Sequence, residues 1–273
     1  MYWRIIRTNE DGSLRLLYSG ISPDTAEGYI GASAFNPSYN DPMYIGYMYG
    51  TSDSLESNRT NINDSTIKIY VDTWYQNNLL NNYDKYISKA AIYCNDRSIS
   101  SDYTYSVSDN FGHGPDTRLK NYTPTYKCGG NGTGGLFESA QAVADKFSAS
   151  LDAGGNGQLT YPIALMTADE VAFAGGKRST DLSSPYAWYY TNSQGESIIG
   201  EHSWWTLSPL GWFASHERMV DINSIMHGHL GSESVQYDHG VRPSTSLAPC
   251  VDIKSGNGTP ESPYEIDYES SCK

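Results

Sequence analysis

Turn-forming residues interrupt this chain at short intervals, and that feature most limits what it can fold into. The sequence contains 26 glycines and 12 prolines among 273 residues, with many asparagine, aspartate and serine residues. These residue types supply the backbone conformations that tight turns require. The 23 tyrosines tolerate half-buried positions, because each ring carries a polar hydroxyl. The pattern predicts abundant turns and excludes a helical bundle.

Alternating apolar residues predict strands near both ends. Trp3 to Tyr18 reads as a β-hairpin with its turn at residues 9–12, because an Asp-Gly turn between alternating runs is a strong hairpin signal. Residues 251–253 and 264–266 read as closing strands. Between the hairpin and the first helix, residues 19–54 predict an ordered, irregular surface.

Periodicity and capping residues predict a few helices. The clearest one begins near Asp64 or Ser65, and Ile67, Tyr70, Val71 and Trp74 follow the spacing of one buried face. A capping box at residues 167–170 predicts a short helix ended by Gly175 and Gly176. Two further elements are predicted as helical, at residues 83–91 and 137–148. We expect a single domain over residues 1–273, with insertions at about 101–160 and 177–200.

The net charge of −13 limits the partners of the protein. Without a basic stripe the chain cannot release counterions from a phosphate backbone, so we expect no nucleic-acid partner. No apolar run of membrane length occurs, so we expect no membrane insertion of this chain. The first residues read as a strand and not as a signal peptide. The chain is thus either cytosolic or a secreted protein without its leader or anchor.

The four cysteines favour the second alternative. Cys94, Cys128, Cys250 and Cys272 include no Cys-x-x-Cys motif, and an even count in an acidic, tyrosine-rich chain favours an oxidising compartment. Three pairings are possible, and four independent buried thiols are the alternative. The order along the sequence suggests Cys94–Cys128 and Cys250–Cys272. We therefore expect a secreted or cell-surface protein.

One segment near the C-terminus has an unusual composition. Five of the 6 histidines and three of the 6 tryptophans lie within residues 202–239. Large amphipathic side chains on a turn-rich backbone suit recognition better than filling a core. We interpret residues 205–243 as a binding segment. Its candidate ligand-binding residues are Leu210, Trp212, Phe213, His216, Glu217, His227, His229, Glu233, Gln236, Tyr237, Asp238 and His239. Its candidate framework residues are Trp204, Trp205, Ser208, Pro209, Gly240 and Arg242.

An ordered set of motifs resembles secreted domains of gut Firmicutes that often follow pilin-like or signal segments. The motifs begin at Tyr2–Ile6, Ile30–Asn36 and Tyr47–Gly50, continue through Asp64–Lys68, Tyr93–Ser98 and Thr167–Gly176, and end at Trp204–Pro209, Gly240–Pro243 and Gly256–Pro260. The resemblance covers Tyr2 to about Ile266. It implies an α+β domain of the C-type-lectin-like fold, with a mixed or antiparallel sheet, few helices and long loops, and with both termini in one sheet.

The same fold includes the variable proteins of diversity-generating retroelements, in which a reverse transcriptase rewrites adenine positions near the 3′ end of the gene. Gly240-Val241-Arg242 is similar to the motif that ends their variable segment. The resemblance implies a hypervariable ligand-binding face held by an invariant framework. The leading hypothesis is therefore a non-catalytic bacterial adhesin or receptor-binding domain, with an unknown protein or glycan as ligand.

Metal and enzyme readings receive less support from the sequence. His227 and His229, with His216, His239 or Glu233, would make a generic metal site, and we expect none. The residue triplets of calcium-dependent lectins are absent, so we expect no cofactor. No hydrolase, P-loop, zinc-protease or dinucleotide motif occurs. Two alternatives remain: a structural pilus-tip or surface-assembly module, and an oxidase of the formylglycine-generating type that would use Cys250 and Cys272.

Overall fold

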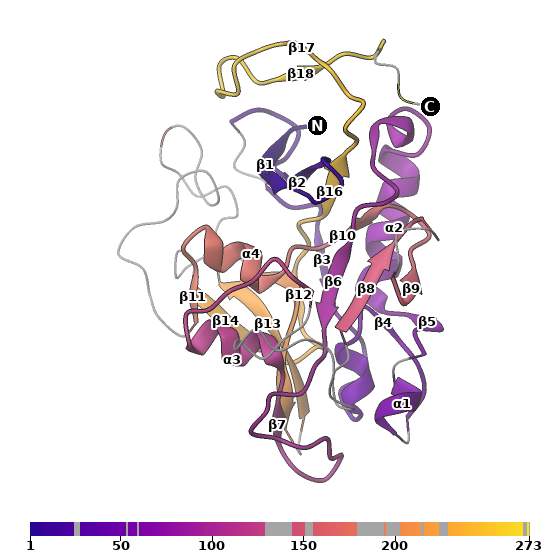
Figure 1. Cartoon of the computed structure of the whole chain (residues 1–273), viewed down its shortest axis with the longest axis vertical. Helices are drawn as coiled ribbons and strands as arrows, with labels where there is room; N and C mark the ends of the chain where they lie inside the picture. Colours follow the sequence, from indigo (N-terminus) through magenta and orange to yellow (C-terminus); the bar gives the residue numbers. More distant parts are fainter. Residues whose placement is uncertain are drawn as a thin grey trace.

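The computed structural model describes residues 1–24, 28–52, 54–58, 60–128, 144–150, 155–178, 194, 203–213, 216–223, 229–269 and 272. The fold is α+β, as expected. Most of its regular structure is strand, arranged in several small sheets with few helices around them (Figure 1). Within this part of the chain, no helix is long and apolar enough to cross a bilayer.

The first sheet joins strands from three distant parts of the chain. Its order is β1-β2-β16-β10, and every neighbouring pair is antiparallel. The predicted hairpin is confirmed, with Gly12 at the positive φ of 82° that its turn requires. The strand β16 lies between the hairpin and β10 and brings a late segment beside the N-terminus. The strands are β1 (Trp3–Thr8), β2 (Leu14–Tyr18), β10 (Ile163–Ala164) and β16 (Ser244–Leu247).

The second sheet contains most of the predicted binding segment. Its order is β11-β14-β13-β12-β15-β3, and β7 pairs with the outer half of β12. The long strand β12 therefore has neighbours on both sides. The strands are β3 (Ala32–Ala34), β7 (Phe111–Gly112), β11 (Lys177–Arg178), β12 (Trp204–Phe213), β13 (His216–Asn223), β14 (His229–Glu233) and β15 (Asp238–Gly240).

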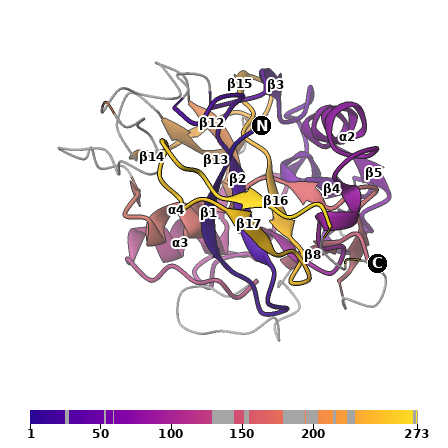
Figure 2. The ribbon, with the colours of Figure 1, turned by 90° about the horizontal axis from the view of Figure 1, so that it is seen from above.

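Three smaller sheets complete the strands. They are β4 (Met48–Tyr49) with β5 (Asn63–Asp64), β6 (Tyr93–Asp96) with β8 (Ala144–Ser148) and β9 (Gly157–Gln158), and β17 (Ile253–Ser255) with β18 (Glu265–Ile266). The predicted closing strands thus form, but as a separate ribbon and not in the sheet of the N-terminal hairpin. In Figure 1 and Figure 2 this ribbon lies over that hairpin.

The helix predicted at residues 137–148 is wrong for its described part. Residues 144–148 form β8, which pairs antiparallel with β6 and parallel with β9. Phe147 is fully buried there, so sheet pairing and burial override the helix preference of alanine. Residues 137–143 lie outside the described residues.

The predicted helix near residue 65 is confirmed as α2 (Thr66–Asn78). The Ser65 hydroxyl accepts a hydrogen bond from the Lys68 amide at 3.2 Å and caps it, and Ile67, Val71 and Tyr75 are buried. The capping box of Thr167 and Glu170 is also present and opens α4 (Ala168–Phe173). The remaining helical elements are α1 (Leu55–Asn58), α3 (Gly114–Lys120) and the 3-10 turns η1 (Pro42–Ile45) and η2 (Asp84–Tyr86). The last is the only helical part of the predicted element 83–91.

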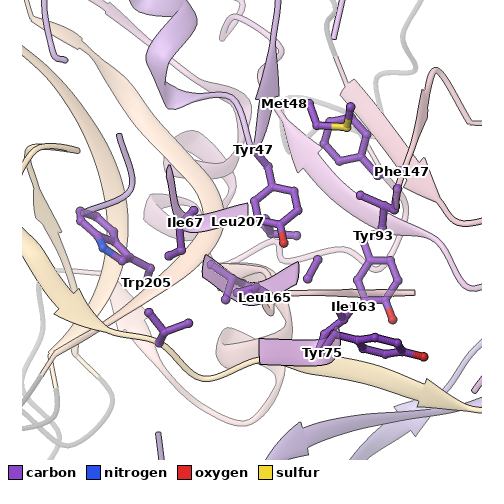
Figure 3. Packing of buried hydrophobic residues seen from close by; sticks show 14 of the residues in the cluster. Tyr47, Met48, Ile67, Tyr75, Tyr93, Phe147, Ile163, Leu165, Trp205 and Leu207 are labelled. Carbon is purple, nitrogen blue, oxygen red and sulfur yellow. The ribbon is translucent and has the colours of Figure 1, made fainter. Parts of the chain in front are cut away.

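The main core lies between α2 and the two larger sheets. Tyrosine and tryptophan rings make up much of it, among them Tyr47, Tyr75 and Trp205 (Figure 3). Phe35 and Tyr47 are fully buried, which corrects the expectation that residues 19–54 form only a surface. The segment 101–160 also enters the interior, through Phe111 and Phe147.

Both disulfides form in the order suggested by the sequence. Cys94 pairs with Cys128, and Cys250 pairs with Cys272. The first connects β6 to the segment after α3, and the second closes the base of the β17–β18 ribbon. In the loop-entropy account, closing 22 residues stabilises the fold by about 3 kcal/mol. Two such bonds fit an oxidising, extracellular environment.

Candidate functional site

The strand β12 forms the buried part of the predicted binding segment. Every residue from Trp204 to Trp212 is buried. The Trp205 ring nitrogen donates to the Ser33 carbonyl at 2.9 Å, and the Leu207 carbonyl accepts from the Asn95 side chain at 2.7 Å. Since both faces of the strand are buried and these two polar groups are hydrogen-bonded, β12 is fixed in place.

Arg242 connects this strand to the N-terminal hairpin. Its guanidinium is fully buried, donates to the carbonyls of Gly28 at 2.9 Å and Tyr18 at 3.3 Å, and lies 4.8 Å from the Trp204 ring centroid. A planar guanidinium suits this combination of carbonyl binding and ring stacking. The arginine therefore acts on the segment indirectly, by fixing the chain on either side of it.

Leu210 and Trp212 differ from their expected place on a ligand face. Leu210 is 5% exposed and Trp212 is 4% exposed. Trp212 packs with Ile99 and Phe111, and its ring nitrogen donates to the Val107 carbonyl at 3.3 Å. Trp212 is covered by β7, which pairs with this end of β12, whereas Leu210 packs in a different cluster with Leu119, Met166 and Val171. Both residues belong to the interior.

Phe213 and the first residues of β13 lie at the far end of the same strand. Phe213 is half-buried and packs against the cluster that contains Leu210, and it pairs with His216 in the register. Glu217 pairs with Trp212. The side chains of His216 and Glu217 lie outside the described residues, as does His227 as a whole. Nine residues of strand, about 30 Å, separate Phe213 from Trp204 at the other end.

A short exposed turn joins β14 to β15. Tyr237 is 54% exposed, Asp238 is exposed and Gln236 is half-buried. The Tyr237 amide donates to the Ser234 carbonyl at 3.1 Å and closes the turn. Below it Val235 is fully buried, and its carbonyl accepts from the Asn36 amide at 3.0 Å. An exposed aromatic ring therefore stands on a fixed backbone.

His239 and Glu233 border this turn. The His239 ring meets the Trp205 ring edge-on, with the centroids 4.7 Å apart, and its Nδ1 atom is hydrogen-bonded to the Ser203 hydroxyl. Burial lowers the pKa of His239, while the carboxylates of Glu233 and Asp238 act in the opposite direction. The two carboxylates therefore lie near the His239 ring. We call Glu233, Gln236, Tyr237, Asp238 and His239 the turn surface.

His229 lies apart from the turn surface in the register of the sheet. It is half-buried at the start of β14, where it pairs with Asn223 of β13 and Lys177 of β11. Among the described residues, no group of three or more histidine, cysteine or acidic side chains is arranged to hold a metal ion.

The structure thus divides the described ligand-binding candidates into three groups, with His229 apart from all of them. Leu210 and Trp212 are interior, Phe213 with the backbone of His216 and Glu217 is at the end of β12, and the turn surface is at the start of β15. Sequence reasoning missed the pairing of β7 with β12. Phe111 is about a hundred positions before Trp212, and no local signal connects them.

Sequence reasoning also missed a buried ionic cluster behind the second sheet. Arg118 of α3 donates to Asp96 of β6 at 2.6 Å and to Asp169 of α4 at 2.8 and 2.9 Å. All three side chains are buried. Burial raises the pKa of Asp96, and the facing guanidinium acts against that change. The cluster ties α3 to α4 and has a structural role.

Comparisons with known proteins give no further assignment: no family model, no curated protein and no solved structure matches this chain.

Proposed function

We propose that the protein is a non-catalytic, secreted or cell-surface binding domain that presents the turn surface to a protein or glycan. One observation carries the proposal. A half-exposed tyrosine, two carboxylates and an amide lie on or beside a turn whose backbone is fixed by buried neighbours, and the His239 ring packs beneath them on Trp205. Such preorganised amphipathic groups lose little conformational entropy on binding, which is what a recognition surface requires.

The chemistry of the turn surface defines its ligand class. The face of the Tyr237 ring would stack against a sugar ring or an apolar side chain, while Gln236 and Asp238 would form hydrogen bonds with hydroxyl or amide groups. Glu233 and Asp238 make the surface acidic, so a neutral or basic ligand is favoured.

The resemblance to C-type-lectin-like variable proteins extends the proposal to diversification. The packing restricts which positions tolerate change. A Cβ atom added at Gly211 would lie 2.6 Å from the Phe111 carbonyl oxygen, and Leu210 and Trp212 are buried. We therefore expect diversification to spare residues 210–212 and to include the turn surface.

Sequencing the DNA beside the gene tests that extension. The expected result is a near-copy of the 3′ coding segment, beside a reverse-transcriptase gene, that differs at template adenines in the codons of the turn surface. Adenine differences concentrated in the codons of residues 210–212 would contradict it.

Binding itself is tested on a glycan array and on cells displaying candidate protein ligands. We compare the wild type with Tyr237→Ala/Asp238→Ala and with the matched control Tyr122→Ala/Asp102→Ala. Tyr122 is 67% exposed and Asp102 is exposed, so the control removes the same groups elsewhere on the surface. The turn variant should lose at least about tenfold in affinity for any ligand found, with an unchanged melting temperature. Equal binding by all three proteins would reject the turn surface as the site.

A further inference from the structure

The β17–β18 ribbon is a second surface that the proposed function does not use. It stands at the top of the molecule in Figure 1, above the N-terminal hairpin, whereas β12, β13 and β14 lie in the lower half. Its base is held by the Cys250–Cys272 disulfide and by the Tyr86 hydroxyl, which donates to the Tyr268 carbonyl at 2.6 Å. All three residues of β17 are exposed.

The ribbon is amphipathic. Ile253 pairs with Ile266 across the two strands, so their side chains share one face, and Tyr264 lies two residues before Ile266 on the same face. Lys254, Ser255 and Glu265 interact on the other side, where Glu265 accepts from the Ser255 hydroxyl at 2.9 Å and faces Lys254 at 3.5 Å. One face is apolar and the other is polar.

The apolar face is only partly covered. Ile253 is 47% exposed and Tyr264 is 51% exposed. The Tyr264 ring is nevertheless fixed, because it packs on the backbone of Gly258, where an added Cβ atom would lie 2.7 Å from the ring. A two-stranded ribbon in water is marginally stable unless its apolar face is buried. The disulfide holds in place a face that lacks a covering layer.

The acidic charge of the ribbon indicates which kind of partner would cover its apolar face. Residues 251–269 contain five carboxylates, Asp252, Glu261, Glu265, Asp267 and Glu269, against the single cation Lys254. A second copy would bring the same acidic ribbon and a net charge of −13, so like charges would oppose self-association. Anionic membranes and nucleic acids are repelled for the same reason.

We infer that the β17–β18 ribbon docks a second protein, through a segment that alternates apolar and basic residues. Ile253, Tyr264 and Ile266 would contact its apolar side chains, and the surrounding carboxylates would pair with its lysine or arginine residues. This docking surface is independent of the turn surface.

A synthetic peptide of alternating lysine and valine serves as the probe, and a peptide of alternating glutamate and valine as its control. Binding is measured by fluorescence anisotropy with the full chain and intact disulfides, at low and physiological salt. The lysine peptide should bind at least about tenfold more tightly than the glutamate peptide, and its affinity should fall as the salt concentration rises.

Two variants locate the binding. Ile253→Ser/Tyr264→Ser should lower the affinity for the lysine peptide at least about tenfold. Ile62→Ser/Tyr122→Ser should leave that affinity unchanged. This variant makes the same replacements elsewhere on the surface, at residues that are 69% and 67% exposed. Where the first variant does not fold, Glu261→Gln/Glu269→Gln provides the second measurement and should reduce both the affinity and its salt dependence.

Three results would overturn the inference. The first is equal binding of the two peptides, and the second is an equal loss of affinity in the ribbon variant and its matched control. The third is a dimer in sedimentation that Ile253→Ser/Tyr264→Ser abolishes, because a second copy would then be the occupant of the ribbon. Binding of the lysine peptide should be unaffected by Tyr237→Ala/Asp238→Ala, so this inference and the proposed function can fail separately.

Discussion

The strand β12 and the turn surface lie about thirty residues apart in the chain; both carry aromatic residues, but they differ in environment. Trp205 and Trp212 of β12 are buried, whereas Tyr237 is half-exposed on a turn. The difference comes from neighbours: β12 has strands on both sides, while Tyr237 lies between β14 and β15, next to the buried Val235. Composition alone identifies a segment rich in large side chains, and strand pairing decides which of them are exposed to solvent.

Replacing Trp205 should have the largest effect on the stability of the fold. Its ring is fully buried against Phe35 and His239, and its ring nitrogen donates to the Ser33 carbonyl. Trp205→Ala should lower the free energy of unfolding by about 4 kcal/mol, because it leaves a cavity and an unpaired carbonyl. Denaturant unfolding followed by circular dichroism measures it. A loss below about 1 kcal/mol would show that β12 is not the buried strand described.

Lowering the pH should have the second largest effect, through the buried His113 beside Leu210 of β12. His113 donates its amide proton to the Leu210 carbonyl and is buried, and burial lowers its pKa to about 4 from 6.5. The unfolded chain therefore binds this proton first, and stability is lost as the pH falls from 6.5 towards 4, by about 3 kcal/mol in total.

The measurement is the free energy of unfolding across that pH range, for the wild type and for His113→Gln. The variant should start less stable at pH 7 and should show a weaker dependence on pH. Parallel curves for the two proteins would mean that another group controls the acid response.

Gly211→Ala should have an intermediate effect. The new methyl group would lie 2.6 Å from the Phe111 carbonyl oxygen, so β7 and β12 must separate. We expect a loss of about 2 kcal/mol, visible as a lower melting temperature. An unchanged melting temperature would show that β7 does not pack against β12 at this residue.

Tyr237→Ala should have the smallest effect on stability. The ring is 54% exposed, so we expect a change within about 0.5 kcal/mol in the free energy of unfolding. Thermal unfolding measures it beside Trp205→Ala. A loss comparable to that of Trp205→Ala would remove the distinction between β12 and the turn surface.

Local sequence patterns predict much of the fold. The Asp-Gly hairpin, the Ser65 cap, the capping box of Thr167 and the order of the disulfides are all visible in the sequence, because each depends on residues close together or on chain order. Residues 144–148 mislead, because the strand pairing of Phe147 with Tyr93 depends on a partner more than fifty residues away.

The candidate site was less visible than the fold. Its segment could be recognised from its histidines and tryptophans, yet the burial of Trp212 depends on Phe111 of β7, which no spacing connects to it. The place of Asp238 and His239 likewise depends on a distant strand, β3, which pairs with β15. Composition locates a region of interest, and long-range pairing selects the residues within it.

The position of β16 has a consequence for how the protein is made. This strand lies between β2 and β10, so the sheet that begins with the first residues of the chain is completed by residues 244–247. During synthesis the hairpin must wait, with one edge unsatisfied, until nearly the whole polypeptide has emerged. Contacts between such distant residues slow folding, so this sheet is completed only after most of the chain is available.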